Sequence, residues 1–225
     1  FRAPLGRTIT EEEVAASGTD SCIYVISRQA GEGGDRKAEK GDMFLTDEET
    51  DAIRFCAQHY ENFVLVINCG SSIDMSFAEE IPGINAIIYL CQLGTECGHA
   101  FADVISGAVS PSGKLSDTWA RQYADIPFAD EYSYLNGNLD EEFYQEGIYV
   151  GYRYFETIPG AAEKVCYPFG YGLSYTTFDW QCLSACADPD RICVRVRVTN
   201  TGTFAGRQVM QLYSHPRGCR MDMAA

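Results

Sequence analysis

Residues 63–70 read FVLVINCG, a nearly continuous apolar run without the polar alternation of a half-exposed strand. Two similar runs flank it, CIYVIS at 22–27 and INAIIYLCQ at 84–92. Amphipathic stretches at 45–60 and 96–108 predict helices between and after these strands. Apolar strands that alternate with helices are typical of a parallel sheet covered on both faces. We therefore predict an α/β fold, a three-layer α/β/α sandwich with a mainly parallel sheet.

Two helix starts carry capping signals. Thr46, near the start of the predicted helix at 45–60, is its predicted cap and has Glu49 three residues later, which is the capping-box spacing. Thr10 is the predicted cap of a helix whose first turn contains residues 11–13, all glutamates.

The pattern changes towards the C-terminus. Residues 1–125 are the predicted sandwich domain, and 126–189 a Tyr- and Gly-rich irregular wrap and linker. After residue 190, apolar and polar residues alternate around Asn200-Thr201-Gly202, which predicts an antiparallel hairpin. Residues 190–225 are therefore predicted to be a truncated all-β segment, whose last residues show no strand pattern.

Composition excludes several functions. The chain has 225 residues and a net charge of -15, which disfavours nucleic acid and anionic membrane surfaces as partners. Its apolar runs are shorter than the ~20 residues of a membrane span. Ten cysteines are present, and we expect reduced, buried thiols in a reducing, cytoplasmic compartment. Five of them fall in predicted strands or helices, namely Cys22, Cys56, Cys69, Cys91 and Cys193.

The loop at 28–42 directly follows the first strand, and ligands sit at the carboxyl ends of such strands. Its Gly31-Glu32-Gly33-Gly34 run lacks the GxGxxG spacing, and the Glu32 carboxylate would repel a phosphate. Two interpretations stay open, a flexible surface loop and a carboxyl group projected from the catalytic edge of the sheet.

Other chemistry has weaker support. No GxSxG motif occurs, and the serines at 71–72 and 174 have no histidine placed beside them in sequence. The histidines are interpreted as structural: His59, His99 and His215. Cysteine spacing does not match a zinc site. We expect no metal and no cofactor.

Five segments together resemble a known family: YVISRQAGEGGDRK, VLVINCGSSIDM, YLCQLGTECGHAFADVISGAVSPSGKLSDTW, EGIYVGYRYF and YPFGYGLSYTTF. In this order they are similar to glycoside hydrolase family 3, the β-glucosidase family, over roughly residues 5–213. The part from VRVRVTNTG onward resembles the start of its fibronectin type III-like domain. The sequence departs from the usual family pattern at 91–96 and at Ser116, both in framework segments.

The resemblance implies an active site shared between a (β/α)8 barrel and this sandwich. The barrel, in cis, would supply an Asp nucleophile, which we do not find in this chain. Glu32 would be the general acid/base, supported by Arg28, Asp35 and Arg36. The substrate would be a β-glucoside or oligosaccharide, and the isolated chain is expected to be inactive. We also hypothesise that Asp35 pairs with Arg36 and keeps that charge away from Glu32.

Two other functions are possible on the sequence. One is a non-catalytic sandwich module that binds carbohydrate or docks a domain. The other is a nucleotide-binding α/β domain. A carboxyl group at Glu32 disfavours both, because neither function needs it.

Overall fold

The computed structural model describes residues 8–29, 36–131, 137–138 and 140–214. The chain divides into two compact units. The first contains Phe1–Cys97 and Thr118–Pro168, and the second contains Gly98–Asp117 and Phe169–Met221.

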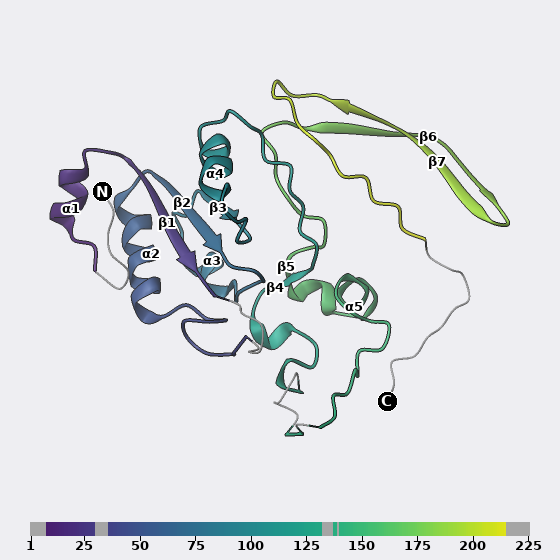
Figure 1. Ribbon diagram of the computed structural model, residues 1–225, viewed down its shortest axis with the longest axis horizontal. Coiled ribbons are helices and arrows are strands. Elements are labelled where there is room, and N and C mark those ends of the chain that lie inside the picture. The colour runs from purple at the N-terminus through teal and green to yellow at the C-terminus, as the bar shows by residue number, and fades with distance from the viewer. Residues whose placement is uncertain (1–7, 30–35, 132–136, 139, 215–225) are drawn as a thin grey trace. The chain divides into compact units, whose positions relative to one another are not determined.

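A parallel sheet is the centre of the first unit (Figure 1). Its strands are β1 (Ser21–Ser27), β2 (Asn62–Asn68) and β3 (Ala86–Tyr89), in that order across the sheet. Every pairing is parallel. The α/β class predicted from the apolar runs is confirmed.

Helix α2 (Asp47–His59) lies against β1 and β2. Ile53 and Cys56 of this helix are fully buried, as are Phe63 and Leu65 of β2. The other side of β1 is more open, with Ile23 and Val25 nearly half exposed. Part of the core of this unit therefore lies between α2 and the sheet.

Both predicted caps are present. The Glu49 backbone N–H donates to Thr46 Oγ1 at 3.1 Å, and the Thr46 N–H donates to the Glu49 carboxylate at 2.9 Å. Helix α1 (Glu11–Ser17) has the same arrangement with Thr10 and Glu13, but it buries no residue. The same type of N-cap therefore begins α2, which packs in the core, and α1, which does not.

Short elements make up the rest of the first unit. A small hydrophobic cluster in this unit contains Ala120, Phe155 and Ala161. The elements are α3 (Ser76–Glu80), β4 (Trp119–Ala120) paired antiparallel with β5 (Val165–Tyr167), α5 (Tyr152–Thr157), and 3-10 turns at Tyr123–Asp125, Ala129–Glu131 and Ala161–Lys164. Helix α4 (Cys97–Ile105) begins at the boundary of the two units. Of the helices in the described ranges, none has the length and apolarity to cross a bilayer.

The second unit contains an antiparallel hairpin of β6 (Phe178–Asp188) and β7 (Arg191–Asn200). The prediction of a hairpin turn at Asn200-Thr201-Gly202 was wrong, because β7 pairs with the strand before it. The Asn200 side chain accepts hydrogen bonds from Thr176 Oγ1 at 2.6 Å and the Gly202 N–H at 3.0 Å, which ends the strand. Within the described residues after Asn200, no further strand forms.

The cysteines are less buried than predicted. Cys56 and Cys69 are buried, but Cys91 and Cys193 are exposed. Cys69 and Cys91 also lie just past the ends of β2 and β3 rather than within them. Cys91 lies in the turn after β3, and Cys193 lies in β7, which is exposed along nearly its whole length.

Candidate active site

Arg28 is the first residue after β1 and is almost completely buried. Its Nη1 and Nη2 donate to the two carboxylate oxygens of Glu49 at 2.8 and 2.7 Å. Its Nε donates to the Asp42 carbonyl at 2.8 Å, and further bonds reach the carbonyls of Phe44 and Ser27. This is a fork-to-fork ion pair, the strong and directional kind.

Glu49 has two roles at once. Its Oε2 accepts from the Thr46 N–H as part of the helix cap and from Arg28 Nη2 as part of the ion pair. The start of α2 is therefore tied directly to the carboxyl end of β1. The sequence pattern revealed the cap but not the ion pair.

Arg36 stands on the far side of the glycine segment in the sequence. Its Nε forms a short ion pair with the Asp42 carboxylate, and its Nη1 donates to Ser71 Oγ at 2.5 Å. Partial burial opposes ionisation of Asp42. The Lys37 N–H and the Arg36 and Arg28 guanidiniums outweigh that effect and hold its pKa below the ordinary value.

Asp42 joins the two arginines. Its carbonyl accepts from Arg28 Nε and also from Arg36 Nη2, the latter at 3.1 Å. Both guanidiniums are thus held on one turn and each has a carboxylate partner. The hypothesised partner Asp35 lies outside the described residues, and Asp42 is the partner that the structure gives to Arg36.

The carboxyl ends of the three strands are cross-connected here. The Arg28 N–H donates to the Asn68 carbonyl at 3.1 Å, and Gln92 Nε2 donates to the Arg28 carbonyl at 2.7 Å. Cys91 and Gln92, just after β3, both have left-handed backbones with φ of 54° and 51°. Strained residues of this kind concentrate at functional sites. The arrangement favours the sheet edge as the site.

The predicted site residues divide into two groups. Arg28 and Arg36 are brought together through Asp42, as described above. Glu32 and Asp35 lie outside the described residues. Sequence reasoning missed Asp42, Glu49 and Gln92 as parts of this site, because no motif marks their pairing with Arg36, with Arg28 and with the Arg28 carbonyl.

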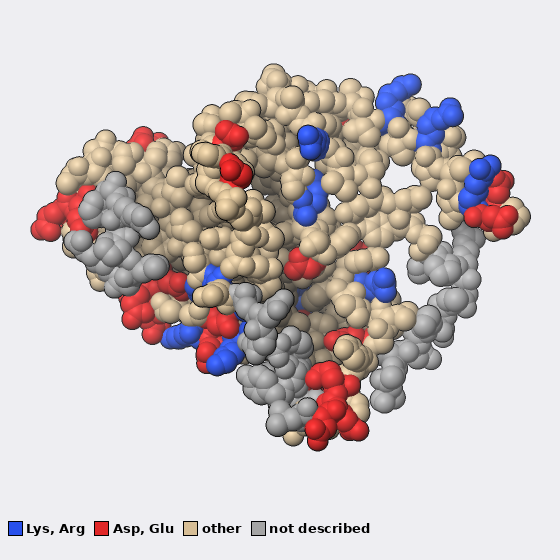
Figure 2. All heavy atoms as spheres, in the orientation of Figure 1, with Lys and Arg blue, Asp and Glu red and all other residues tan. Residues whose placement is uncertain are grey.

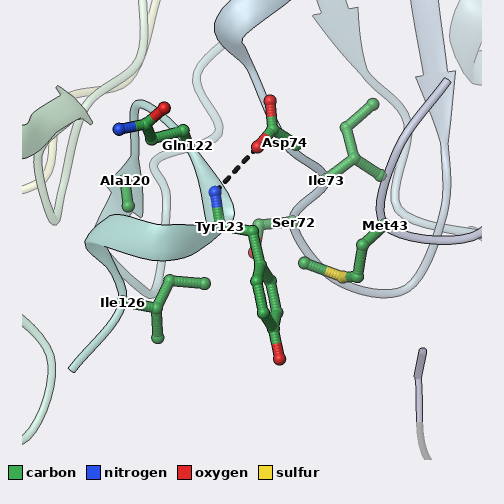
Figure 3. Close-up of a pocket in the computed structure, with 8 residues that line it drawn as sticks. All are labelled: Met43, Ser72, Ile73, Asp74, Ala120, Gln122, Tyr123 and Ile126. Carbon is green, nitrogen blue, oxygen red and sulfur yellow. Dashed lines mark hydrogen bonds between the residues drawn. The ribbon is translucent and has the colours of Figure 1, made fainter. Parts of the chain in front are cut away.

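Figure 3 shows a pocket near this edge, lined among others by Met43, Ser72 and Tyr123. It is too small for a sugar. It offers about 10 Å³ to a water-sized molecule, roughly the space for one water. Asp74 closes one side, accepting from the Tyr123 N–H at 2.7 Å and from Ser76 Oγ at 2.5 Å. Its role is to fix the segment at Tyr123 to the loop after β2.

The remaining candidates have structural contacts. Ser71 accepts the Arg36 bond, and His59 ends α2 with its Nδ1 2.8 Å from the Phe55 carbonyl. His99 lies within α4. In the ranges that the structure describes, no group of three or more His, Cys, Asp or Glu side chains is arranged to hold a metal ion.

Figure 2 shows acidic side chains gathered over α1, whose first turn contains Glu11, Glu12 and Glu13.

Comparisons with known proteins agree with this fold. Residues 4–152 match the model of the glycosyl hydrolase family 3 C-terminal domain. The chain belongs to glycosyl hydrolase family 3.

Family 3 relatives cover most of this chain. It is 38% identical to "Beta-glucosidase A" of Butyrivibrio fibrisolvens, over 91% of this chain and 29% of the relative. It is 38% identical to a β-glucosidase of Ruminococcus albus, over 94% of this chain and 21% of that protein. The chain therefore spans less than a third of the length of these relatives.

Solved β-glucosidase structures share the fold. A β-glucosidase from Paenibacillus barengoltzii matches with a TM-score of 0.82 and 37% identity, covering 89% of this chain and 22% of that one. β-Glucosidase 3B from Thermotoga neapolitana in complex with glucose matches with a TM-score of 0.77 and 38% identity, covering 86% and 27%. This family 3 chain is thus homologous to the C-terminal part of β-glucosidases.

Proposed function

We propose that this chain supplies the general acid/base, Glu32, of a retaining exo-acting β-glucosidase. The substrate class is a terminal β-D-glucosyl residue of a glucoside or oligosaccharide. The nucleophile, an Asp, comes from a (β/α)8 barrel outside this chain. Homology to β-glucosidases, and a relative solved with glucose, support this assignment.

The observation that carries the proposal is the anchoring of both flanks of the Glu32 segment. Arg28 precedes the segment and is locked to Glu49, and Arg36 follows it and is locked to Asp42. Both flanks lie at the carboxyl end of the sheet, where α/β folds bind ligands. A catalytic carboxyl group needs a rigid support of this kind.

The charge arrangement also suits a proton donor. A bare guanidinium beside Glu32 would favour its ionised form, which cannot donate a proton. Here each arginine is already paired with a carboxylate, which largely neutralises the positive charge of its guanidinium. Asp42 and Glu49 thus balance the charges of the two arginines, and a contribution from Asp35 stays a prediction.

The mechanism follows from the retaining geometry, in which the two carboxyl groups stand about 5–5.5 Å apart. The barrel Asp attacks the anomeric carbon while Glu32 protonates the leaving glycosidic oxygen. Glu32, now ionised, removes a proton from the water that hydrolyses the glycosyl-enzyme. One residue therefore acts first as acid and then as base.

Leaving-group dependence in the full-length protein tests the role of Glu32. Glu32→Ala should lower kcat/KM by roughly 10²–10⁴-fold on substrates whose leaving group needs protonation. The loss should be much smaller on dinitrophenyl glucoside. Azide should restore turnover and give a β-glucosyl azide, because a small anion replaces the missing base.

Glu39→Ala is the matched control, since Glu39 is an exposed carboxylate in the same loop region. It should leave kcat/KM within about twofold of the unmodified protein. Equal activity of Glu32→Ala and the unmodified protein would instead favour the non-catalytic sandwich module.

A further inference from the structure

Cys22 of β1 and Cys56 of α2 face each other across the helix–sheet interface. Their Sγ atoms are 3.7 Å apart, which is contact distance between sulfurs. Cys56 is fully buried, whereas Cys22 is only partly buried. A disulfide requires the two sulfurs to approach to about 2.05 Å, a movement of under 2 Å.

The two thiols differ in character. The hydrogen bond with Cys56 lowers the pKa of Cys22 and outweighs the opposing effect of burial. The same bond, together with burial, raises the pKa of Cys56 well above the ordinary value. Cys22 is therefore the nucleophile of the pair and Cys56 the resolving thiol, because the thiolate is the reactive form.

We propose that Cys22 and Cys56 form a reversible disulfide that clamps α2 to β1 when the chain meets an oxidised thiol such as glutathione disulfide. Neither residue has a role in the proposed hydrolysis. The site is therefore an additional one, available to the same chain.

The exchange balances in two steps. The Cys22 thiolate attacks one sulfur of glutathione disulfide, which forms a mixed disulfide and releases one glutathione thiolate. Cys56, losing its proton to solvent, then attacks the Cys22 sulfur, which forms the protein disulfide and releases the second glutathione. Two protein thiols are oxidised and one glutathione disulfide is reduced to two thiols.

The consequence for the site follows from the positions of the two cysteines. They are 34 residues apart, and the loop that they close contains Arg28, Arg36 and Glu49. Constraining such a loop stabilises the folded state. The clamp would also hold the anchors of the Glu32 segment, a regulatory effect that rests on the proposed function.

Thiol mapping under native conditions tests the clamp. The full-length protein is incubated with glutathione disulfide, remaining thiols are alkylated, and peptides are identified by mass spectrometry. We expect a peptide pair linked through Cys22 and Cys56, reversed by dithiothreitol, and a thermal midpoint higher than that of the reduced protein. Recovery of both cysteines as alkylated thiols would overturn the proposal.

Serine variants separate the steps. In Cys56→Ser, Cys22 should stop as the mixed disulfide with glutathione, and in Cys22→Ser, Cys56 should stay free. Cys69→Ser is the matched control, because Cys69 is equally buried but its Sγ bonds to the Ser71 carbonyl. Cys69→Ser should still form the Cys22–Cys56 disulfide. Loss of that disulfide in Cys69→Ser would contradict the assignment of Cys22 and Cys56 as the reacting pair.

β-Glucosidase activity is measured separately on the reduced and oxidised forms. The mapping result does not depend on it, so the clamp and the role of Glu32 fail or succeed independently. If hydrolysis is absent in both forms while the link forms, the proposed function is wrong and the clamp stands.

Discussion

At the residue scale, the most informative side chain is Arg28. Its exposed fraction is only 6%, although arginine is rarely buried without a partner. The partner is Glu49, and three backbone carbonyls accept the remaining N–H groups of the guanidinium. A buried cation is tolerated when its donors are satisfied in this way, and removing one partner leaves the other uncompensated.

We therefore expect Arg28→Met to lower the free energy of unfolding by about 3 kcal/mol, because the partly buried Glu49 carboxylate loses its counter-ion. Lys37→Met is the matched variant. Lys37 lies 4.0 Å from Glu39 and both side chains are more than half exposed, so the cost should stay below about 0.5 kcal/mol. Urea unfolding of both variants measures the difference. Equal costs would mean that the buried pair contributes no more than a surface one.

At the element scale, α1 and α2 begin with the same chemistry but have different neighbours. Each has a threonine cap and a glutamate three residues into the helix. Helix α2 buries Ile53 and Cys56 against the sheet, whereas α1 buries nothing. Local unfolding of α1 thus exposes little surface, while α2 can only unfold with the core.

Thr46→Ala should lower the global free energy of unfolding by about 1 kcal/mol, the usual value of a lost N-cap. Thr10→Ala removes an equivalent cap but should cost under about 0.5 kcal/mol globally, since α1 frays on its own. Chemical denaturation measures the global free energy of unfolding. The rate of amide hydrogen exchange in α1 should rise in Thr10→Ala. A full 1 kcal/mol global loss in Thr10→Ala would show that α1 is part of the cooperative core.

The β6–β7 hairpin shows where sequence patterns give an incomplete prediction. Alternation in ICVRVRV correctly predicted a strand over the residues of β7. Its partner β6 alternates only from Phe178 to Cys182, because a register shift between Cys182 and Ser184 interrupts the pattern. Both strands are exposed along nearly their whole length. A turn signal at Asn200 was real, but it ends a strand instead of joining two.

At the scale of the whole molecule, the chain matches only a part of the length of its relatives. It covers 29% or less of the two relatives described above. The proposed mechanism needs a second carboxylate that comes from outside the chain. The domain limits at 125, 189 and 225 and the fibronectin type III-like start remain predictions.

We expect residues 1–225 alone to hydrolyse no aryl β-glucoside above the rate of the buffer, because protonation without a nucleophile does not complete the retaining reaction. Discontinuous assays with p-nitrophenyl β-glucoside measure this, and the full-length protein is the positive control. Turnover by the bare chain that disappears in Glu32→Ala would contradict the shared-site model.

The sequence by itself determined the α/β class, the helix caps and the family, whereas the role of the Glu32 segment stays a prediction. Those features follow from local rules: strands come from apolar runs, caps from spacing of three, and family from ordered motifs. The tertiary structure decided the partners of Arg28 and Arg36, the pairing of β6 with β7, and the contact of Cys22 with Cys56. These depend on which distant groups the sheet and helix bring within a few ångströms, and no local pattern carries that information.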